Sequence, residues 1–232
     1  MSIKAVFIDI DDTLLSFSGY VRQAMKDGFR LFGLKPYEEE MFPIFERVNN
    51  GLWRELEKGE LTFEELIKVR WNRIFQELGI DFDGVRFETF FREQLHFSAV
   101  PEEGAMELLS YLAERYVLCA ASNGPYEQQM NRLRVGKMED SFRHFFISSK
   151  IGAQKPSREF FDACFAELRE TEFPDLQPEE TIIIGDSLTS DISGGTEYGM
   201  HTCHYKKKPL RQAETSTAEY TVDKLLDIIK IL

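Results

Sequence analysis

The sequence predicts an α/β fold: a doubly wound, mainly parallel sheet with a small all-helical domain inserted after the first strand. Two observations lead to this prediction. From about residue 96 onward, helical patterns alternate with short strand-like runs, which is typical of parallel strands joined by helical crossovers. Residues from about 18 to 92 show helical periodicity and no strand pattern.

The expected strands are short apolar runs, and helical patterns separate them. The strand-like runs are 5–8, 116–121, 145–148, 181–184 and 201–205. Helices are expected after Pro101, over 126–135, from Pro156 onward and over 222–231. Because helical crossovers cover both faces of a parallel sheet, this order indicates a Rossmann-like core.

The helical insertion is clearest over residues 62–79. Thr62 and Glu65 match a capping box, an apolar stripe follows at helical spacing, and Gly79 suits the C-terminal stop. We therefore expect an α/β core made of residues 1–17 and 93–232, and a helical domain made of residues 18–92.

Composition and charge limit the classes of partner. The 232 residues carry a formal net charge of −12 and are 43% hydrophobic, which is ordinary for a soluble globular protein. This acidic balance argues against a nucleic-acid or anionic-membrane partner, but not against a small phosphorylated substrate, which needs only a few local cations or a metal. The acidic run Glu38–Glu40 and the basic run Lys206–Lys208 are short, and both are expected at the solvated surface.

The cysteines indicate a reducing compartment. Cys119, Cys164 and Cys203 are odd in number, widely spaced and surrounded by apolar or aromatic residues, so we interpret them as buried free thiols. The first acidic residues come too early for a signal peptide, and no apolar run approaches membrane-spanning length. The expected location is the cytoplasm, and the oligomeric state stays open.

Polar side chains follow three of the expected strands at the point where each strand ends. Asp9, Asp11 and Asp12 follow the first strand, Ser122 and Asn123 follow the second, and Gly185-Asp186 follow the run 181–184. Ligands bind beyond the carboxyl ends of the strands in such sheets, so we expect these side chains to meet. The alternative is a set of ordinary solvated turns, because close carboxylates repel one another and are costly to desolvate.

Four motifs together favour a functional site. They are Asp9-Ile10-Asp11-Asp12-Thr13, Ser122-Asn123-Gly124, Lys155-Pro156 and Gly185-Asp186-Ser187-Leu188-Thr189-Ser190-Asp191. In this order, each at an expected strand end or helix start, they resemble the haloacid-dehalogenase-like hydrolase superfamily over essentially the whole chain. Haloacid dehalogenases themselves lack the aspartate found here at Asp11, so the resemblance favours phosphate-ester chemistry.

The resemblance implies a role for each acidic motif residue. Asp9 is the nucleophile that forms an aspartyl-phosphate, and Asp11 is the general acid and base. Mg²⁺ is held by Asp9, by Asp186 and by the main-chain carbonyl of Asp11. A cation among these carboxylates makes the acidic cluster tolerable.

The resemblance also assigns the residues that hold the phosphate. Ser122 and main-chain N–H groups at Asn123 bind the phosphoryl oxygens, and Lys155 supplies positive charge beside them. Asp191 supports Lys155 or a metal-bound water, and Thr13 buttresses the loop.

The helical insertion resembles the cap domain of this superfamily, which closes over the site and selects the substrate. Its segment 49–70 is similar to that of bacterial pyrimidine 5′-nucleotidases that remove modified nucleotides. Phe17 or Trp53 is the candidate wall for a planar base, Asn49 the candidate to read its edge, and Arg70 belongs to the same segment. The alternative for Trp53 is ordinary core packing.

The function that the resemblance implies is a Mg²⁺-dependent nucleoside 5′-monophosphatase that prefers pyrimidine nucleotides. One alternative is a phosphatase for another small phosphorylated metabolite, such as a sugar phosphate or phosphoglycolate. Another is a phospho-accepting signalling domain, which also places acidic residues, Ser or Thr, and Lys at strand ends. Those domains are much shorter and have no cap, so the long helical insertion after Leu14 argues against them.

Overall fold

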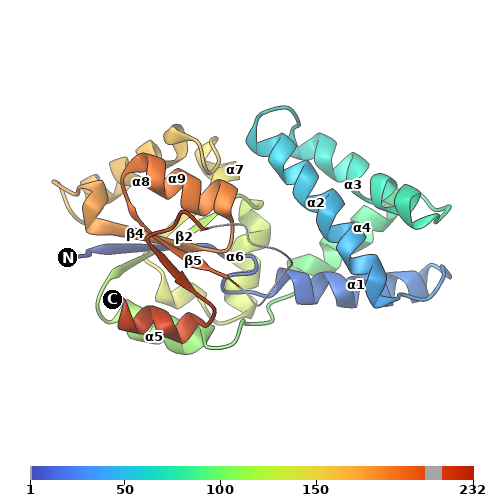
Figure 1. Cartoon of the computed structure of the whole chain (residues 1–232), viewed down its shortest axis with the longest axis horizontal. Coiled ribbons are helices and arrows are strands. Elements are labelled where there is room, and N and C mark those ends of the chain that lie inside the picture. The colour runs from blue at the N-terminus through green and yellow to red at the C-terminus, as the bar shows by residue number, and fades with distance from the viewer. Residues whose placement is uncertain (1, 207–215) are drawn as a thin grey trace. The chain divides into compact units, whose positions relative to one another are not determined.

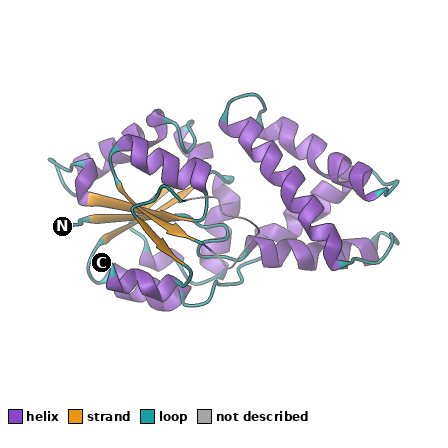
Figure 2. Ribbon diagram, viewed as in Figure 1, coloured by secondary structure: helices purple, strands orange, loops and turns teal. Residues whose placement is uncertain are grey.

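The computed structural model describes residues 2–206 and 216–232, and the chain divides into two compact units (Figures 1 and 2). The α/β unit comprises Met1–Ser16 and Ala99–Leu232, and the helical unit comprises Phe17–Ser98. The insertion expected over 18–92 therefore begins one residue earlier in the structure and extends to Ser98.

The α/β unit is built on a parallel sheet, which confirms the predicted fold class. Its strands are β1 (Ala5–Ile8), β2 (Val117–Ser122), β3 (His144–Ile147), β4 (Thr181–Gly185), β5 (His201–Tyr205) and β6 (Tyr220–Val222). They lie in the order β3-β2-β1-β4-β5-β6, and every neighbouring pair is parallel. The first strand of the chain thus lies inside the sheet, between β2 and β4.

Helices cover both faces of this sheet (Figure 2). They are α5 (Ala105–Ala113), α6 (Tyr126–Val135), α7 (Ser148–Ile151), α8 (Arg158–Thr171) and α9 (Ser193–Tyr198). Successive side chains of a strand point to opposite faces, and β1 follows this rule: Val6 and Ile8 pack in the core that contains α5, and Phe7 packs in the core that contains α8. Figure 1 shows α5 on one side of the sheet and α8 with α9 on the other.

The C-terminal segment corrects one prediction. The sequence pattern predicts a helix over 222–231, but Val222 ends strand β6 and a short 3₁₀ helix spans Leu225–Lys230. Val222 pairs with Tyr205 of β5, so its backbone groups are satisfied by a neighbouring strand, which the local apolar spacing cannot reveal. Of the basic run, Lys206 is exposed, and its other two lysines lie outside the described residues.

The helical unit contains α1 (Phe17–Leu31), α2 (Phe42–Glu57), α3 (Phe63–Leu78) and α4 (Gly84–His96), with a 3₁₀ turn over Glu39–Met41. The ends of α3 are as predicted: Thr62 and Glu65 form both bonds of a capping box, and Gly79 ends the helix with φ 64°. Within the described residues, no helix combines the length and apolarity that crossing a membrane requires.

The core of the helical unit is aromatic. The indole of Trp71 is fully buried, and its centre lies 4.3 Å from the ring centre of Phe87 and 5.2 Å from that of Phe91. A Cβ atom placed on Gly28 would lie 2.6 Å from the ring of Phe87, so α1 and α4 approach closely only because position 28 is glycine. The helical unit thus has a hydrophobic core of its own, and its aromatic contacts stabilise that core.

The three cysteines are buried and free, as predicted. Burial raises the pKa of the Cys119 and Cys164 thiols well above their ordinary value. Both thiols therefore stay protonated and behave as small apolar side chains in the core of the α/β unit.

Candidate active site

Three strands of the α/β unit bring their polar ends together. Asp9 directly follows β1, Ser122 is the last residue of β2, and Asp186 directly follows β4. The main-chain N–H of Asp9 donates to the carbonyl of Ile184 over 2.9 Å, which holds the ends of β1 and β4 side by side. The carboxylates of Asp9, Asp186 and Asp191 each offer an oxygen, and these oxygens all lie within 4.8 Å of one another.

Lys155 lies at the centre of this cluster, and its side chain is 1% exposed. Its ammonium Nζ donates to Asp9 Oδ1 over 2.9 Å, to Asp191 Oδ1 over 2.5 Å and to the carbonyl of Ala121 over 2.6 Å. An ammonium has three hydrogens, so each of them has an acceptor. Although burial lowers the pKa of Lys155, the two adjacent carboxylates outweigh it and raise that pKa above its ordinary value. The lysine therefore carries its charge at neutral pH.

Asn123 fixes the backbone of Lys155. Its side-chain Nδ2 donates to the carbonyl of Lys155 over 2.8 Å, and its Oδ1 accepts from the N–H of Lys155 over 2.9 Å. The side chain of Asn123 is therefore committed to the lysine loop, and only its main chain is available for a ligand.

Asp191 is held from two sides. Its Oδ1 accepts from Lys155, and its Oδ2 accepts from the main-chain N–H of Ser187 over 3.1 Å. A Cβ atom at Gly185 would lie 2.1 Å from Asp191 Oδ2, so this close approach requires glycine at the end of β4. Both oxygens of Asp191 are used within the protein, whereas in the described part of the chain no hydrogen bond or ion pair reaches the carboxylate of Asp186.

The carboxylates are difficult to ionise together. Burial, reinforced by Asp191 and Asp11, raises the pKa of Asp9 to about 7, although Lys155 opposes the shift. Burial, together with Asp9 and Asp12, raises the pKa of Asp186 well above its ordinary value. A site with hard oxygen donors and excess negative charge fits one divalent cation such as Mg²⁺.

Asp11 lies beside this cluster, and its side chain is about one third exposed. Arg132 Nη1 donates to Asp11 Oδ1 over 2.5 Å, and Gln129 Nε2 donates to Asp11 Oδ2 over 2.7 Å. Gln129 Nε2 also donates to Ser122 Oγ over 2.7 Å. Gln129 and Arg132 are thus two residues of the candidate active site that the sequence motifs did not identify.

The loop between Asp9 and Leu15 is tightly wound. The N–H groups of Leu14 and Leu15 both donate to the carbonyl of Ile10, and the N–H of Asp12 donates to the carbonyl of Leu15. Asp12 adopts φ 56°, a left-handed conformation that aspartate tolerates better than most residues. Thr13 is fully buried in this loop, and its hydroxyl has no hydrogen-bond partner among the described residues, so its expected buttressing role stays a prediction.

The cap residues proposed from the sequence fall into two groups within the helical unit. Buried Arg70 donates to Glu88 over 3.0 and 2.6 Å and to Asn49 Oδ1 over 3.1 Å, and its guanidinium lies 4.9 Å from the ring centre of Phe91. Phe17 packs edge-on against the same Phe91 ring, at 6.3 Å between ring centres. Arg70 and Phe17 therefore both contact Phe91, and Asn49 joins this group through its hydrogen bond with Arg70.

Trp53 belongs to a different part of the helical unit. Its indole packs on Phe63, at 6.1 Å between ring centres, and no aromatic contact joins it to Phe91 among the described residues. Glu88, the acidic partner of Arg70, is also buried, and it lies outside the segment 49–70 that the sequence singled out.

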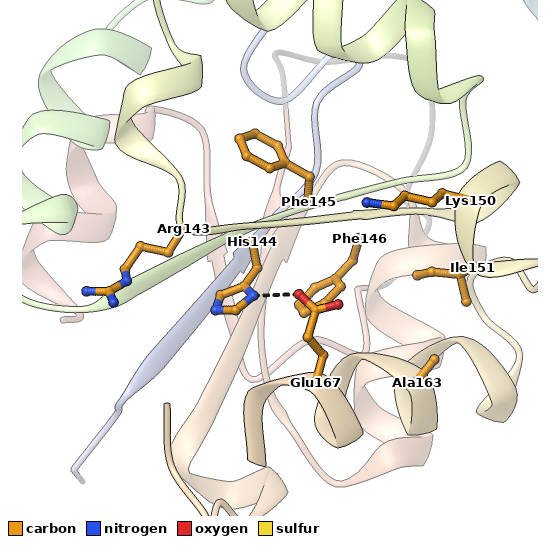
Figure 3. A pocket seen from close by; sticks show the side chains of 8 residues that line it. All are labelled: Arg143, His144, Phe145, Phe146, Lys150, Ile151, Ala163 and Glu167. Atoms are coloured by element: carbon orange, nitrogen blue, oxygen red, sulfur yellow. Dashed lines mark hydrogen bonds and ion pairs between the residues drawn. The ribbon is translucent and has the colours of Figure 1, made fainter. Parts of the chain in front are cut away.

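A separate hollow of about 400 Å³ lies at the edge strand β3 (Figure 3). It is lined by Arg143, His144, Phe145, Phe146, Lys150, Ile151, Ala163 and Glu167. His144 Nδ1 lies 2.7 Å from Glu167 Oε1, the contact drawn as a dashed line in Figure 3. Its lining includes none of the motif residues, so the candidate active site remains the cluster around Asp9.

Known proteins resemble this chain over its full length. The family model described as haloacid dehalogenase-like hydrolase matches residues 3–199. The HAD-hydrolase YfnB of Bacillus subtilis (strain 168) is 31% identical over 229 residues, which cover 99% of this chain and 95% of YfnB. The pyrimidine 5′-nucleotidase PynA of Streptococcus pneumoniae (strain ATCC BAA-255 / R6) is 32% identical over 236 residues, which cover 99% of this chain and 96% of PynA.

The fold is similar to that of a solved structure as well. A crystal structure of YfnB from Bacillus subtilis bound to magnesium superposes with a TM-score of 0.88 at 31% identity. The match covers 100% of this chain and 99% of that one. The similarity therefore includes both the α/β unit and the helical unit.

Proposed function

We propose a reaction, a mechanism and a substrate class from one premise: the chain belongs to the haloacid dehalogenase-like hydrolase family. The enzyme hydrolyses phosphate monoesters, and its nucleophile is Asp9. The observation that carries this proposal is the contact of Lys155 with Asp9 and Asp191. The carboxylate of Asp186 lies beside them, and Asp11 follows Asp9 two residues later in the chain.

The reaction proceeds in two steps. Asp9 attacks phosphorus, the bond from phosphorus to the ester oxygen breaks, and Asp11 gives its proton to that oxygen as the alcohol leaves. Asp11 then takes a proton from water, the water oxygen attacks phosphorus, and the bond to Asp9 breaks to release inorganic phosphate. Each step leaves Asp11 in the protonation state that the next step requires.

The end of β2 supplies the hydrogen-bond donors that hold the phosphoryl group. Ser122 donates its hydroxyl hydrogen to a phosphoryl oxygen, and the main-chain N–H at Asn123 donates to another. Lys155 neutralises part of the charge that Asp9 and the phosphate bring together. Asn123 contributes indirectly as well, because its side chain fixes the lysine loop.

Mg²⁺ is the cofactor that fits the acidic cluster. Asp9, Asp186 and the main-chain carbonyl of Asp11 would hold it, and Asp191 would stay with Lys155 because both of its oxygens are already bound. When bound, the cation offsets the repulsion between these carboxylates and the incoming phosphate. The magnesium-bound structure of YfnB, at 31% identity, supports this proposal.

The substrate class is a pyrimidine nucleoside 5′-monophosphate, and the helical unit acts as the cap that selects it. PynA, which is named as a pyrimidine 5′-nucleotidase, supports this choice. Arg70 donates to the carbonyl oxygen of the Asn49 amide, so the amide nitrogen is the group of Asn49 that can donate to a base. Uracil and thymine carry carbonyl oxygens on their edges that can accept such a hydrogen bond. Phe17, beside the same cluster, and Trp53 are the two candidate aromatic walls for the base.

The buried free thiols are compatible with a reducing compartment, and we place the enzyme in the cytoplasm. Its partner there is a small phosphorylated metabolite rather than a nucleic acid or a membrane, in keeping with the net charge of −12.

The test compares kcat/KM for dTMP, dUMP, AMP, glucose 6-phosphate and phosphoglycolate at one Mg²⁺ concentration. We expect dTMP and dUMP to lead, because the other compounds leave a base pocket empty or misfilled and lose binding energy. A tenfold lead of a sugar phosphate or phosphoglycolate, about 1.4 kcal/mol in transition-state binding, contradicts the pyrimidine specificity. The Asp9→Asn variant serves as the matched control that assigns phosphate release to this site.

A further inference from the structure

Two polar side chains of α6 are buried against the candidate active site without belonging to any of its motifs. Gln129 is 0% exposed and Arg132 is 1% exposed. They lie three residues apart, on the same face of the helix. Burial of two long polar side chains is costly unless their hydrogen bonds are made, so their partners indicate what they do.

The orientation of the Gln129 amide is fixed by Arg132. The guanidinium Nη1 of Arg132 lies 2.9 Å from Gln129 Oε1. Arginine only donates hydrogen bonds, so the atom of the amide that faces it must be the carbonyl oxygen. The amide nitrogen therefore faces the other way, where Asp11 Oδ2 and Ser122 Oγ each lie 2.7 Å from it. Its two hydrogens serve these two acceptors.

This arrangement determines where the hydroxyl hydrogen of Ser122 can point. Ser122 Oγ accepts from Gln129 and also from the main-chain N–H of Gly124, over 3.1 Å. A hydroxyl oxygen has two acceptor positions and one hydrogen, and both acceptor positions are occupied here. The hydrogen is left to donate to a ligand.

The neighbouring glycine fits the same arrangement. A Cβ atom on Gly124 would lie 2.6 Å from Gln129 Nε2 and 2.9 Å from Gln129 Cδ. Any larger residue at position 124 would displace the amide from Ser122 and Asp11, because Arg132 restricts its movement on the far side.

We propose that Gln129, anchored by Arg132, is a positioning residue: it points the hydroxyl hydrogen of Ser122 at the transferring phosphoryl group and holds Asp11 next to it. This inference rests on the proposed phosphatase function. It adds to that function a link on α6 that joins the acid–base residue to the phosphate-binding residue.

The first measurement uses Gln129→Met, which keeps a similar volume and removes the donors, and Gln128→Met as the matched control. Gln128 is the adjacent glutamine on α6 and only partly buried. We measure turnover of p-nitrophenyl phosphate and the inhibition constant of inorganic phosphate. Gln129→Met should weaken phosphate binding and kcat/KM by about 10- to 100-fold, the usual value of a hydrogen bond to a charged group. Gln128→Met should match the wild type.

The second measurement separates positioning from a general structural effect. If Gln129 acts on phosphate through Ser122, then Gln129→Met should change the phosphate inhibition constant by no more than about 3-fold in a Ser122→Ala background. Equal losses of phosphate binding in the two backgrounds overturn the proposal. If Gln129→Met does not fold, Gln129→Glu takes its place: it has the same shape, but it offers Ser122 an acceptor that draws the hydroxyl hydrogen away from phosphate.

The two proposals fail in different ways. A wild-type enzyme that releases no phosphate from any monoester refutes the proposed function, and the role of Gln129 falls with it. A wild-type phosphatase whose Gln129→Met variant matches Gln128→Met refutes only the positioning role.

Discussion

Replacing Lys155 with methionine removes the buried ammonium at the centre of the candidate active site. Methionine has a similar length and no charge. The change deletes hydrogen bonds of 2.9, 2.5 and 2.6 Å to Asp9, Asp191 and the carbonyl of Ala121. The two carboxylates then remain buried without their cation, so we expect the α/β unit to lose stability and the enzyme to lose activity.

The magnitude follows from the burial of the pair. Removing one partner of a buried ion pair costs about 3–5 kcal/mol. For a chain of this size, 1 kcal/mol shifts Tm by about 2–4 °C, so the α/β unit should melt roughly 6–20 °C lower. Both tryptophans, Trp53 and Trp71, lie in the helical unit, so tryptophan fluorescence reports that unit separately. Calorimetry should show a shifted α/β transition while the fluorescence transition stays near its wild-type temperature.

Lys150→Met is the matched control. Lys150 is exposed, and its ammonium lies 5.0 Å from the ring centre of Tyr126, an interaction worth about 0.5–1 kcal/mol. Its Tm should therefore change by only a few degrees. Equal shifts in Lys150→Met and Lys155→Met would refute the reasoning that the Lys155 ammonium holds the acidic cluster together.

Three further predictions concern the chemistry of the site. Asp9→Asn should abolish phosphate release while circular dichroism shows a normal fold, and Asp11→Asn should slow turnover by roughly 10²–10⁴-fold through loss of the acid–base step; near-normal turnover in either variant contradicts its assigned role. EDTA should abolish activity, Mg²⁺ should restore it, and Ca²⁺ should inhibit because its looser coordination misplaces Asp9; full activity after exhaustive chelation excludes the metal assignment. In metal-free enzyme the pKa of Asp9 rises from its ordinary value of 3.8 to about 7. Folding therefore favours the protonated carboxyl, so the contribution of Asp9 to the free energy of unfolding is fully present below about pH 4 and is lost as the pH rises through about 7. The wild type should therefore lose more Tm than Asp9→Asn between pH 5 and pH 8, and equal losses would show that Asp9 does not titrate in this range.

Most strands of the sheet were predictable because each is a short apolar run that can be recognised in the sequence alone. The apolar runs of β1 and β4 are bounded by polar residues, and each expected strand lies within one residue of the observed one. Strand β6 was missed because only three residues form it and its pairing with β5 is a tertiary contact. Short edge strands depend on a neighbour more than on their own residues.

The part of the candidate active site that lies at the ends of the strands was predictable from the sequence. Asp9 and Asp186 meet because β1 and β4 are adjacent, and this adjacency follows from the topology of a doubly wound sheet. Gln129, Arg132 and Glu88 were not predictable in the same way. Each is a polar residue on an expected helix, where the sequence gives no sign of whether a polar side chain faces water or a buried partner.

The interior position of β1 has a consequence for local opening of the protein. Proteins open in parts, and strands at the edge of a sheet exchange their amide hydrogens sooner than those inside it. Asp9 follows a strand whose four residues are fully buried, and its own N–H is bonded to β4. The edge strands β3 and β6 can therefore fray and re-form while the backbone that carries Asp9 keeps its hydrogen bonds.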